Sequence, residues 1–142
     1  PYTTPFRSKA LRINLNENIY GTFAEIGAGQ ETVRHFFRAG GASGTIAKAM
    51  SAYDKDFSDA IYGLEDDQRY VTESRLKTML THEIHLMEDR LSRKKFPNTL
   101  FFSYANTVAT LDFAKKFKGH GWIGVKFQLD SLEGYKIGRA HV

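Results

Sequence analysis

A glycine-rich turn is the segment of this 142-residue chain whose residue types best fit a chemical function. It lies between an apolar run, Thr22–Ile26, and an amphipathic segment, Glu31–Ala39. The turn consists of Gly27, Ala28, Gly29 and Gln30. Glycine lets the backbone approach an anion closely, and the free amides of a helix N-terminus point toward it. The pattern therefore predicts a phosphate or nucleotide held by the backbone amides of the turn, or else a tight strand-to-helix turn without a ligand.

An acidic residue is placed to complete such a site. Asp54 lies 25 residues beyond Gly29, where a carboxylate binds the ribose hydroxyls in dinucleotide-binding folds. Glu31 stands near the place of the third glycine in that fingerprint. Asp54 also precedes a short predicted helix, Phe57–Tyr62, and suits its N-terminus as a cap. We keep both roles for this residue.

His120 is the candidate for acid–base chemistry. It lies between Gly119 and Gly121, in a segment expected to form an exposed loop, and imidazole titrates near neutral pH. The alternative is a surface histidine without a catalytic role. His82 and His85 are three residues apart, whereas the zinc-binding helix motif places its histidines four apart. No metal site is therefore predicted.

The composition favours a globular domain with a small-molecule partner. Lys and Arg exceed Asp and Glu by only four charges, which is too small a bias to indicate nucleic acid. The absence of cysteine excludes disulfides and thiolate nucleophiles. No run of about 18 apolar residues is present, so no membrane-spanning helix is expected. We expect a cytoplasmic protein that binds a nucleotide-like ligand.

Two family resemblances run through the glycine turn. The stretch Glu25–Gly29 resembles the first motif of S-adenosylmethionine-dependent methyltransferases, with Gly27 and Gly29 matching its glycines. This resemblance implies a loop that approaches the methionine part of S-adenosylmethionine. It also implies an acidic residue after the next strand that binds the ribose of that cofactor.

The second resemblance covers Gly21–Gln30, which is similar to the glycine-threonine-phenylalanine loop of nicotinate-nucleotide adenylyltransferases. It implies ATP as the cofactor and adenylyl transfer as the reaction. Gly27 and Gln30 stand where that family has the two histidines that hold the ATP phosphates. The phosphate loop of this chain therefore lacks both histidines.

A longer stretch, Tyr20–Tyr62, resembles an uncharacterised bacterial family whose members carry the names nicotinate-nucleotide adenylyltransferase and TonB-dependent receptor. The resemblance rests on Phe23–Gln30 and Ser51–Asp54. We set the receptor aside because the membrane part of such receptors is built from strands. The longest element predicted here, Thr72–Lys95, is a helix.

The elements that must position these residues alternate between strands and helices. Strands are predicted at Ala10–Leu15, Thr22–Ile26, Leu100–Tyr104 and Ile123–Leu129, and helices at Glu31–Ala39, Phe57–Tyr62, Thr72–Lys95 and Leu111–Phe117. Thr45–Tyr53 suits either a strand or a helix. The longest helix has an apolar stripe at steps of three and four, formed by Leu76, Met79, Leu80, Ile84, Met87 and Leu91. This order predicts an α/β sandwich that contains a strand–glycine turn–helix unit.

Both ends of the chain resemble translated sequencing-adapter DNA. These ends are residues 1–8 and residues 137–142, and we leave them out of the functional argument. We expect a single α/β domain over residues 9–136 that is a fragment of a longer protein.

Overall fold

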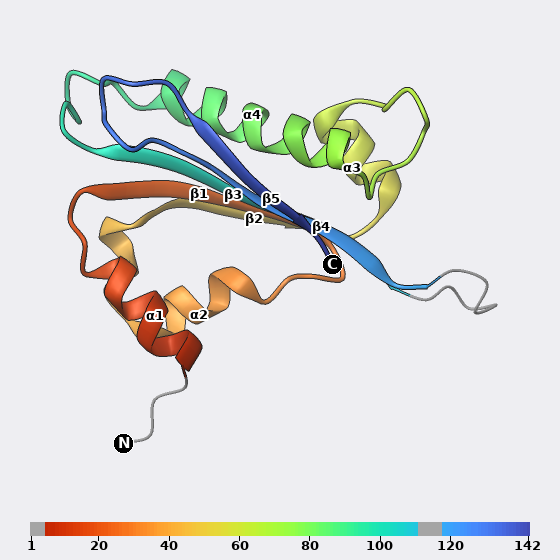
Figure 1. Ribbon diagram of the computed structural model, residues 1–142, viewed down its shortest axis with the longest axis horizontal. Helices are drawn as coiled ribbons and strands as arrows, with labels where there is room; N and C mark the ends of the chain where they lie inside the picture. Colours follow the sequence, from red (N-terminus) through yellow and green to blue (C-terminus); the bar gives the residue numbers. More distant parts are fainter. Residues whose placement is uncertain (1–4, 111–117) are drawn as a thin grey trace.

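The computed structural model describes residues 5–110 and 118–142, which form a mixed β-sheet with helices on both faces (Figure 1). The strands are β1 (Ile19–Gly27), β2 (Ile46–Ala52), β3 (Leu100–Ala109), β4 (His120–Phe127) and β5 (Lys136–His141). The helices are α1 (Pro5–Asn14), α2 (Thr32–Ala39), α3 (Lys55–Tyr62) and α4 (Glu73–Arg90), with a short 3-10 turn, η1, at Ala42–Gly44. The predicted α/β sandwich is confirmed. Over the described ranges, no helix combines the length and apolar character needed to cross a bilayer.

The strand order gives the sheet one edge at which several chain segments meet. The order is β2-β1-β3-β4-β5, with β2, β1 and β3 parallel to one another and β4 and β5 antiparallel to their neighbours. The last residue of β3, Ala109, pairs with the first residue of β4, His120. The ends of β1, β2 and β3 therefore lie beside the start of β4. We call this side of the sheet the carboxyl edge.

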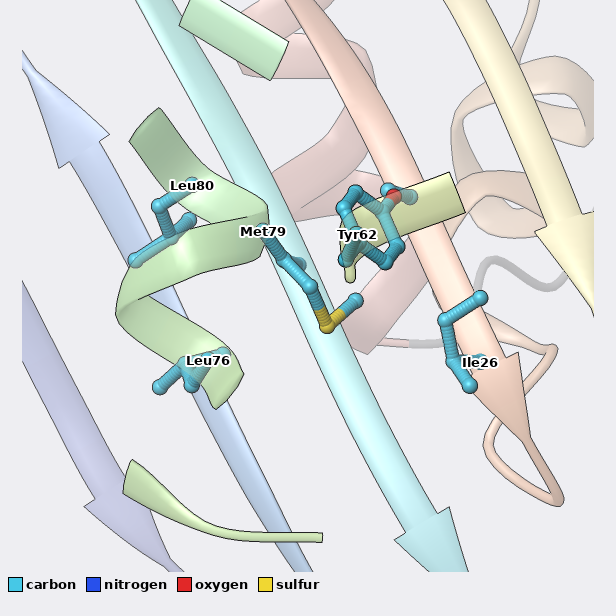
Figure 2. Packing of buried hydrophobic residues seen from close by; sticks show 7 residues of the cluster. Ile26, Tyr62, Leu76, Met79 and Leu80 are labelled. Carbon is cyan, nitrogen blue, oxygen red and sulfur yellow. The ribbon is translucent and has the colours of Figure 1, made fainter. Parts of the chain in front are cut away.

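The core lies between the sheet and α4, which crosses the face formed by β1, β3 and β4 (Figure 1). Its large members are Ile26, Tyr62, Leu76, Met79 and Leu80 (Figure 2). Burying each such side chain contributes about 1.5–3 kcal/mol. The predicted apolar stripe of α4 is confirmed, because its first five residues are all buried. The helix begins after the predicted cap Thr72 but ends at Arg90, five residues earlier than expected.

Helices α1 and α2 pack on each other over the opposite face of the sheet (Figure 1). The prediction of a strand at Ala10–Leu15 is wrong, because all of this segment except Leu15 belongs to α1. The residues of α1 that pack against α2 or into the protein recur every four positions. The Phe6 ring lies 5.4 Å from that of His35 in α2, Ala10 is buried, and Asn14 Nδ2 donates two hydrogen bonds of 2.9 Å to carbonyl oxygens at the end of α2. The alternation of apolar and polar residues within Ala10–Leu15 suggested a strand, whereas the four-residue spacing of these contacts is that of a helix.

The remaining predicted elements are largely confirmed. The ambiguous segment Thr45–Tyr53 forms β2, and its alternate residues are partly buried because they face the α4 side of the sheet. Helix α3 ends before Gly63 as expected. The helix predicted at Leu111–Phe117 lies outside the described residues. Residues 136–141 form β5 beside β4, and the adapter origin of residues 1–8 and 137–142 stays a prediction.

A buried arginine fastens α3 and the loop that follows it to α4. Arg75 is 0% exposed. Its guanidinium donates hydrogen bonds to Ser58 Oγ, to Asp59 Oδ1 at 2.7 Å and to the carbonyl oxygen of Gly63 at 2.6 Å. These bonds fix the position of the segment that leads from the carboxyl edge into α4.

Replacing Arg75 with methionine is expected to lower the free energy of unfolding by about 3 kcal/mol, because it leaves buried acceptors without their donor. Urea denaturation measures this loss. Lys77→Met changes an exposed residue of the same helix and should alter the free energy by less than about 0.5 kcal/mol. Equal effects of the two substitutions would contradict the fastening role of Arg75.

Candidate functional site

The glycine turn lies directly against β3. Gly27 has a φ of +82°, and a Cβ added there would lie 2.0 Å from the carbonyl oxygen of Val108. The same oxygen accepts a hydrogen bond of 3.1 Å from the amide of Ala28. A positive φ and so close a backbone approach both require glycine at position 27. The predicted strand–turn–helix unit is therefore present. Its Gly27 is needed for the close packing of the turn against Val108.

A carboxyl group of the protein caps the helix that follows the turn. Glu25 is 2% exposed, and its Oε1 accepts hydrogen bonds from the amides of Thr32 at 2.9 Å and Val33 at 3.3 Å. These are the first residues of α2. Burial raises the pKa of Glu25, against the opposing effect of the two amide donors. Glu25 thus uses the helix amides that a phosphate contacts in glycine-loop folds.

Hydrogen bonds to both neighbouring strands hold the turn in place. Gln30 Nε2 donates to the carbonyl oxygens of Gly27 at 3.0 Å and of Ala52, at the end of β2, at 3.2 Å. From β3, Asn106 Nδ2 donates to the carbonyl oxygen of Gly29 at 2.7 Å. The side-chain amide of Gln30 thus acts within the protein. A ligand role for the backbone of Gly27, Ala28, Gly29 and Gln30 stays a prediction.

Asp54 lies at the carboxyl edge, two residues after the end of β2. Its Oδ1 accepts a hydrogen bond of 2.9 Å from the amide of Phe57, so the predicted helix-capping role is confirmed. The carboxylate is exposed to solvent. Its second predicted role, binding a ribose, stays a prediction.

A cleft of about 430 Å³ opens at the carboxyl edge. We call it the basic cleft, and its walls include Lys55, Arg69, Tyr70, Ala109, Lys118 and His120. The carbonyl oxygen of Tyr70 accepts a bond of 2.6 Å from Thr107 Oγ1, which anchors this wall to β3. Burial raises the pKa of the Tyr70 phenol, and the nearby Tyr53 and Asp54 act in the same direction. Asp54 itself directly precedes Lys55, a residue of the cleft wall.

The described residues of the basic cleft carry an excess of positive charge. Lys55 is paired with Asp59 at 2.6 Å, and hydrogen bonds from Lys55 and Arg75 lower the pKa of that carboxyl. The side chains of Arg69 and Lys118 are exposed. Among the described residues, neither forms an ion pair within 4.0 Å. These two cations are therefore available to an anion in the cleft.

His120 is the first residue of β4 and is half-buried, whereas the sequence predicted an exposed loop. Its Nδ1 lies 3.1 Å from His141 Nε2, and the His141 ring stacks on Trp122. A hydrogen bond between two imidazoles needs one donor and one acceptor nitrogen, so at least one of the rings is neutral when the bond forms. The structure brings His120 to Arg69 and Tyr70 in the cleft wall. Its acid–base role stays a prediction.

The two other histidines of interest lie apart from this edge. His82 and His85 are exposed on α4, and the His82 ring packs edge-on against Tyr62. Within residues 5–110 and 118–142, no group of three or more acidic or histidine side chains is arranged to hold a metal ion.

Sequence analysis missed the structural role of Glu25 and the presence of Arg69 and Tyr70 in the cleft. A charged residue in the middle of an apolar strand indicates that its charge has a hydrogen-bonding partner inside the protein. Glu25 in the predicted strand Thr22–Ile26 is such a residue. Arg69 ends the polar segment Leu64–Arg69, which has no periodicity, and Tyr70 follows it. Only the folding of this segment onto β3 places the two residues at the edge.

Solved structures share the arrangement of these strands and helices. No protein-family model and no curated protein matches the chain. The competence/damage-inducible protein CihA from Agrobacterium tumefaciens matches with a TM-score of 0.69 and 14% identity over 99% of this chain and 82% of that chain. The chain has a CinA-like fold.

Further structures agree with this fold. The CinA superfamily protein from Escherichia coli matches with a TM-score of 0.59 and 11% identity over 96% of this chain and 73% of that chain. The competence damage-inducible protein A from Klebsiella pneumoniae matches with a TM-score of 0.64 and 8% identity over 96% and 79%. At such identities a CinA-like fold does not assign a function. These neighbours are not adenylyltransferases, and that part of the sequence resemblance stays a prediction.

Gly27→Ala is expected to lower the free energy of unfolding by at least about 2 kcal/mol, because the backbone is left-handed and the methyl group overlaps Val108. Two further glycines separate these causes. Gly63 has a φ of +89° and open space around it, so Gly63→Ala should lower the free energy of unfolding by about 1–2 kcal/mol. Gly44 has neither a positive φ nor a close neighbour, so Gly44→Ala should lower the free energy of unfolding by less than about 0.5 kcal/mol. Thermal unfolding gives all three values, and a neutral Gly27→Ala would disprove the close approach.

Glu25→Gln tests the buried carboxyl group through pH. The native pKa of Glu25 is raised above 4.5, so the native state holds its proton more tightly than the unfolded state does. The stability advantage of Glu25 over glutamine should thus be complete below about pH 4.5 and decline as pH rises through the native pKa. Urea titrations from pH 4 to 7 measure this, with the exposed Glu17→Gln as control. An advantage that grows with pH would show that the amides of α2 lower the pKa instead.

Proposed function

We propose that the protein binds a nucleotide-like, phosphate-bearing small molecule in the basic cleft. The observation that carries the proposal is the pair of cations, Arg69 and Lys118, that lack an ion-pair partner among the described residues at the carboxyl edge. In open α/β sheets, ligands bind outside the carboxyl ends of the parallel strands. The cleft volume lies in the range of small-molecule sites.

In this proposal the phosphates lie in the basic cleft rather than on the first turn of α2. The carboxyl group of Glu25 already accepts hydrogen bonds from the amides of Thr32 and Val33, so these two donors are not free for a phosphate. Asp54 directly precedes Lys55, which lines the cleft, and its carboxylate can accept hydrogen bonds from ribose hydroxyls. The backbone of Gly27, Ala28, Gly29 and Gln30 shapes the edge beside the ligand.

The charge of the cleft favours one of the two cofactor classes that the sequence resemblances imply. ATP and nicotinate mononucleotide bring phosphate, which guanidinium and ammonium groups bind. S-adenosylmethionine brings a positive sulfonium and no phosphate. We therefore propose ATP-like ligands ahead of S-adenosylmethionine. Adenylyl transfer, an acid–base role for His120 and a cytoplasmic location stay predictions.

Calorimetry of the full chain with ATP, nicotinate mononucleotide and S-adenosylmethionine tests the proposal. Lys118→Glu should weaken ATP binding about tenfold or more, because it replaces an attractive charge with a repulsive one. Lys136→Glu makes the same charge change at the opposite end of the sheet and should leave binding within about twofold. A ligand at 100 times its dissociation constant adds about 2.7 kcal/mol of stability, which thermal unfolding detects as well.

Two results would reject this function. The first is the absence of saturable binding of both phosphate ligands at millimolar concentration. The second is equal weakening by Lys118→Glu and Lys136→Glu, which would mean that only the overall charge of the protein attracts the ligand.

A further inference from the structure

A second cavity lies under the C-terminal half of α4, away from the carboxyl edge. It has a volume of about 360 Å³ and is bounded by the first halves of β1 and β2. We call it the α4 cavity. Much of its wall is apolar and comes from Ala47, Leu86, Met87 and Leu91. This size and lining are typical of sites that enclose a small apolar molecule.

One polar group in the wall of this cavity lacks a partner. Thr22 is 2% exposed, and its Oγ1 forms no hydrogen bond with any described residue. Its neighbour in β3, Ser103, is satisfied because its hydroxyl donates to the carbonyl oxygen of Leu80 at 2.9 Å. Buried hydroxyl groups are nearly always hydrogen-bonded. The Thr22 hydroxyl is therefore available to a ligand.

The charges of the described residues that line the α4 cavity sum to one positive unit. Glu83 is 1% exposed, and its two carboxylate oxygens accept bonds from Tyr62 Oη at 2.8 Å and from Lys48 Nζ. Burial together with Glu83 raises the pKa of Tyr62, which therefore acts as a neutral donor. Lys48 and Arg90 each add one positive charge to the wall. A single negative charge balances this set, whereas a phosphate dianion would exceed it beside the buried carboxylate of Glu83.

We infer that the α4 cavity binds a small monocarboxylate with an apolar body. The carboxylate lies among the Thr22 hydroxyl, Lys48 and Arg90, and the apolar body packs against Met87 and its neighbours. One carboxylate oxygen accepts from the Thr22 hydroxyl, and the cations supply charge-assisted donors. This site is separate from the basic cleft and does not depend on the function proposed there.

Calorimetry of the full chain with octanoate tests this inference, and octanol is the matched neutral probe. Octanoate is expected to bind at least tenfold more tightly than octanol. Thr22→Val keeps the shape of the side chain but removes the hydroxyl, and Arg90→Gln removes a charge. Each should weaken octanoate about three- to tenfold. Arg38→Gln, an exposed arginine near the end of α2, is the control and should have no effect.

Lys48 is kept in all variants because removing it would leave Glu83 without its cation. Thermal unfolding checks that Thr22→Val is folded, and its midpoint should be equal to or above that of the parent chain. Amide NMR then locates the site. Shifts on adding octanoate should concentrate at Thr22, Lys48 and Met87 and leave Arg69 and His120 unchanged.

Any one of four outcomes would overturn the inference. The first is that octanoate does not bind at millimolar concentration. The second is that octanol binds as tightly as octanoate, and the third is that the NMR shifts fall outside the α4 cavity. Unchanged affinity in both Thr22→Val and Arg90→Gln has the same meaning, because those residues supply the groups that select a carboxylate. Lys118→Glu should leave octanoate binding unchanged, which separates this test from that of the basic cleft.

Discussion

The structure depends on the pairing of β1 with a parallel strand on each side. A parallel strand in the middle of a sheet is buried on both faces, so it requires a helical layer above and below. Alternate residues of β1 meet these layers. Ala24 and Ile26 join the core beneath α4, and the Phe23 ring lies 5.0 Å from that of Phe36 in α2.

Glu25 is a buried charged residue in this strand, and its hydrogen bonds explain how β1 and α2 form one unit. A buried carboxyl group is costly unless it is hydrogen-bonded. The first amides of α2 supply those bonds, and a helix N-terminus is also the end at which negative charge is favourable. The glycine turn brings the two together, because Gly27 allows the chain to turn against Val108. A pattern typical of phosphate loops therefore serves, in part, an interaction within the protein.

The basic cleft and the α4 cavity differ in charge because of where the strands begin and end. At the carboxyl edge, loops from distant parts of the sequence meet and contribute Arg69, Lys118 and His120. At the other end of β1, the α4 cavity contains a carboxylate, Glu83, that offsets one of its cations. The first arrangement suits a multiply charged phosphate and the second a single carboxylate. The CinA-like fold supplies the framework of both the cleft and the cavity, but their side chains decide which ligand chemistry each one suits.

The sequence by itself determined most of the elements and their order. The apolar stripe and cap of α4, the glycine boundary of α3 and the strand–turn–helix unit follow from patterns within a single segment, so they could be predicted. The prediction of a strand at Ala10–Leu15 was wrong because α1 is stabilised by its contacts with α2. A short alternation of apolar and polar residues does not reveal such a partner helix. Only the tertiary structure decided which charges act together. Glu25 with α2, Arg69 with Lys118, and Lys48 with Glu83 are each joined by the folding of separate segments, and the electrostatics of a site depends on those distances rather than on order along the chain.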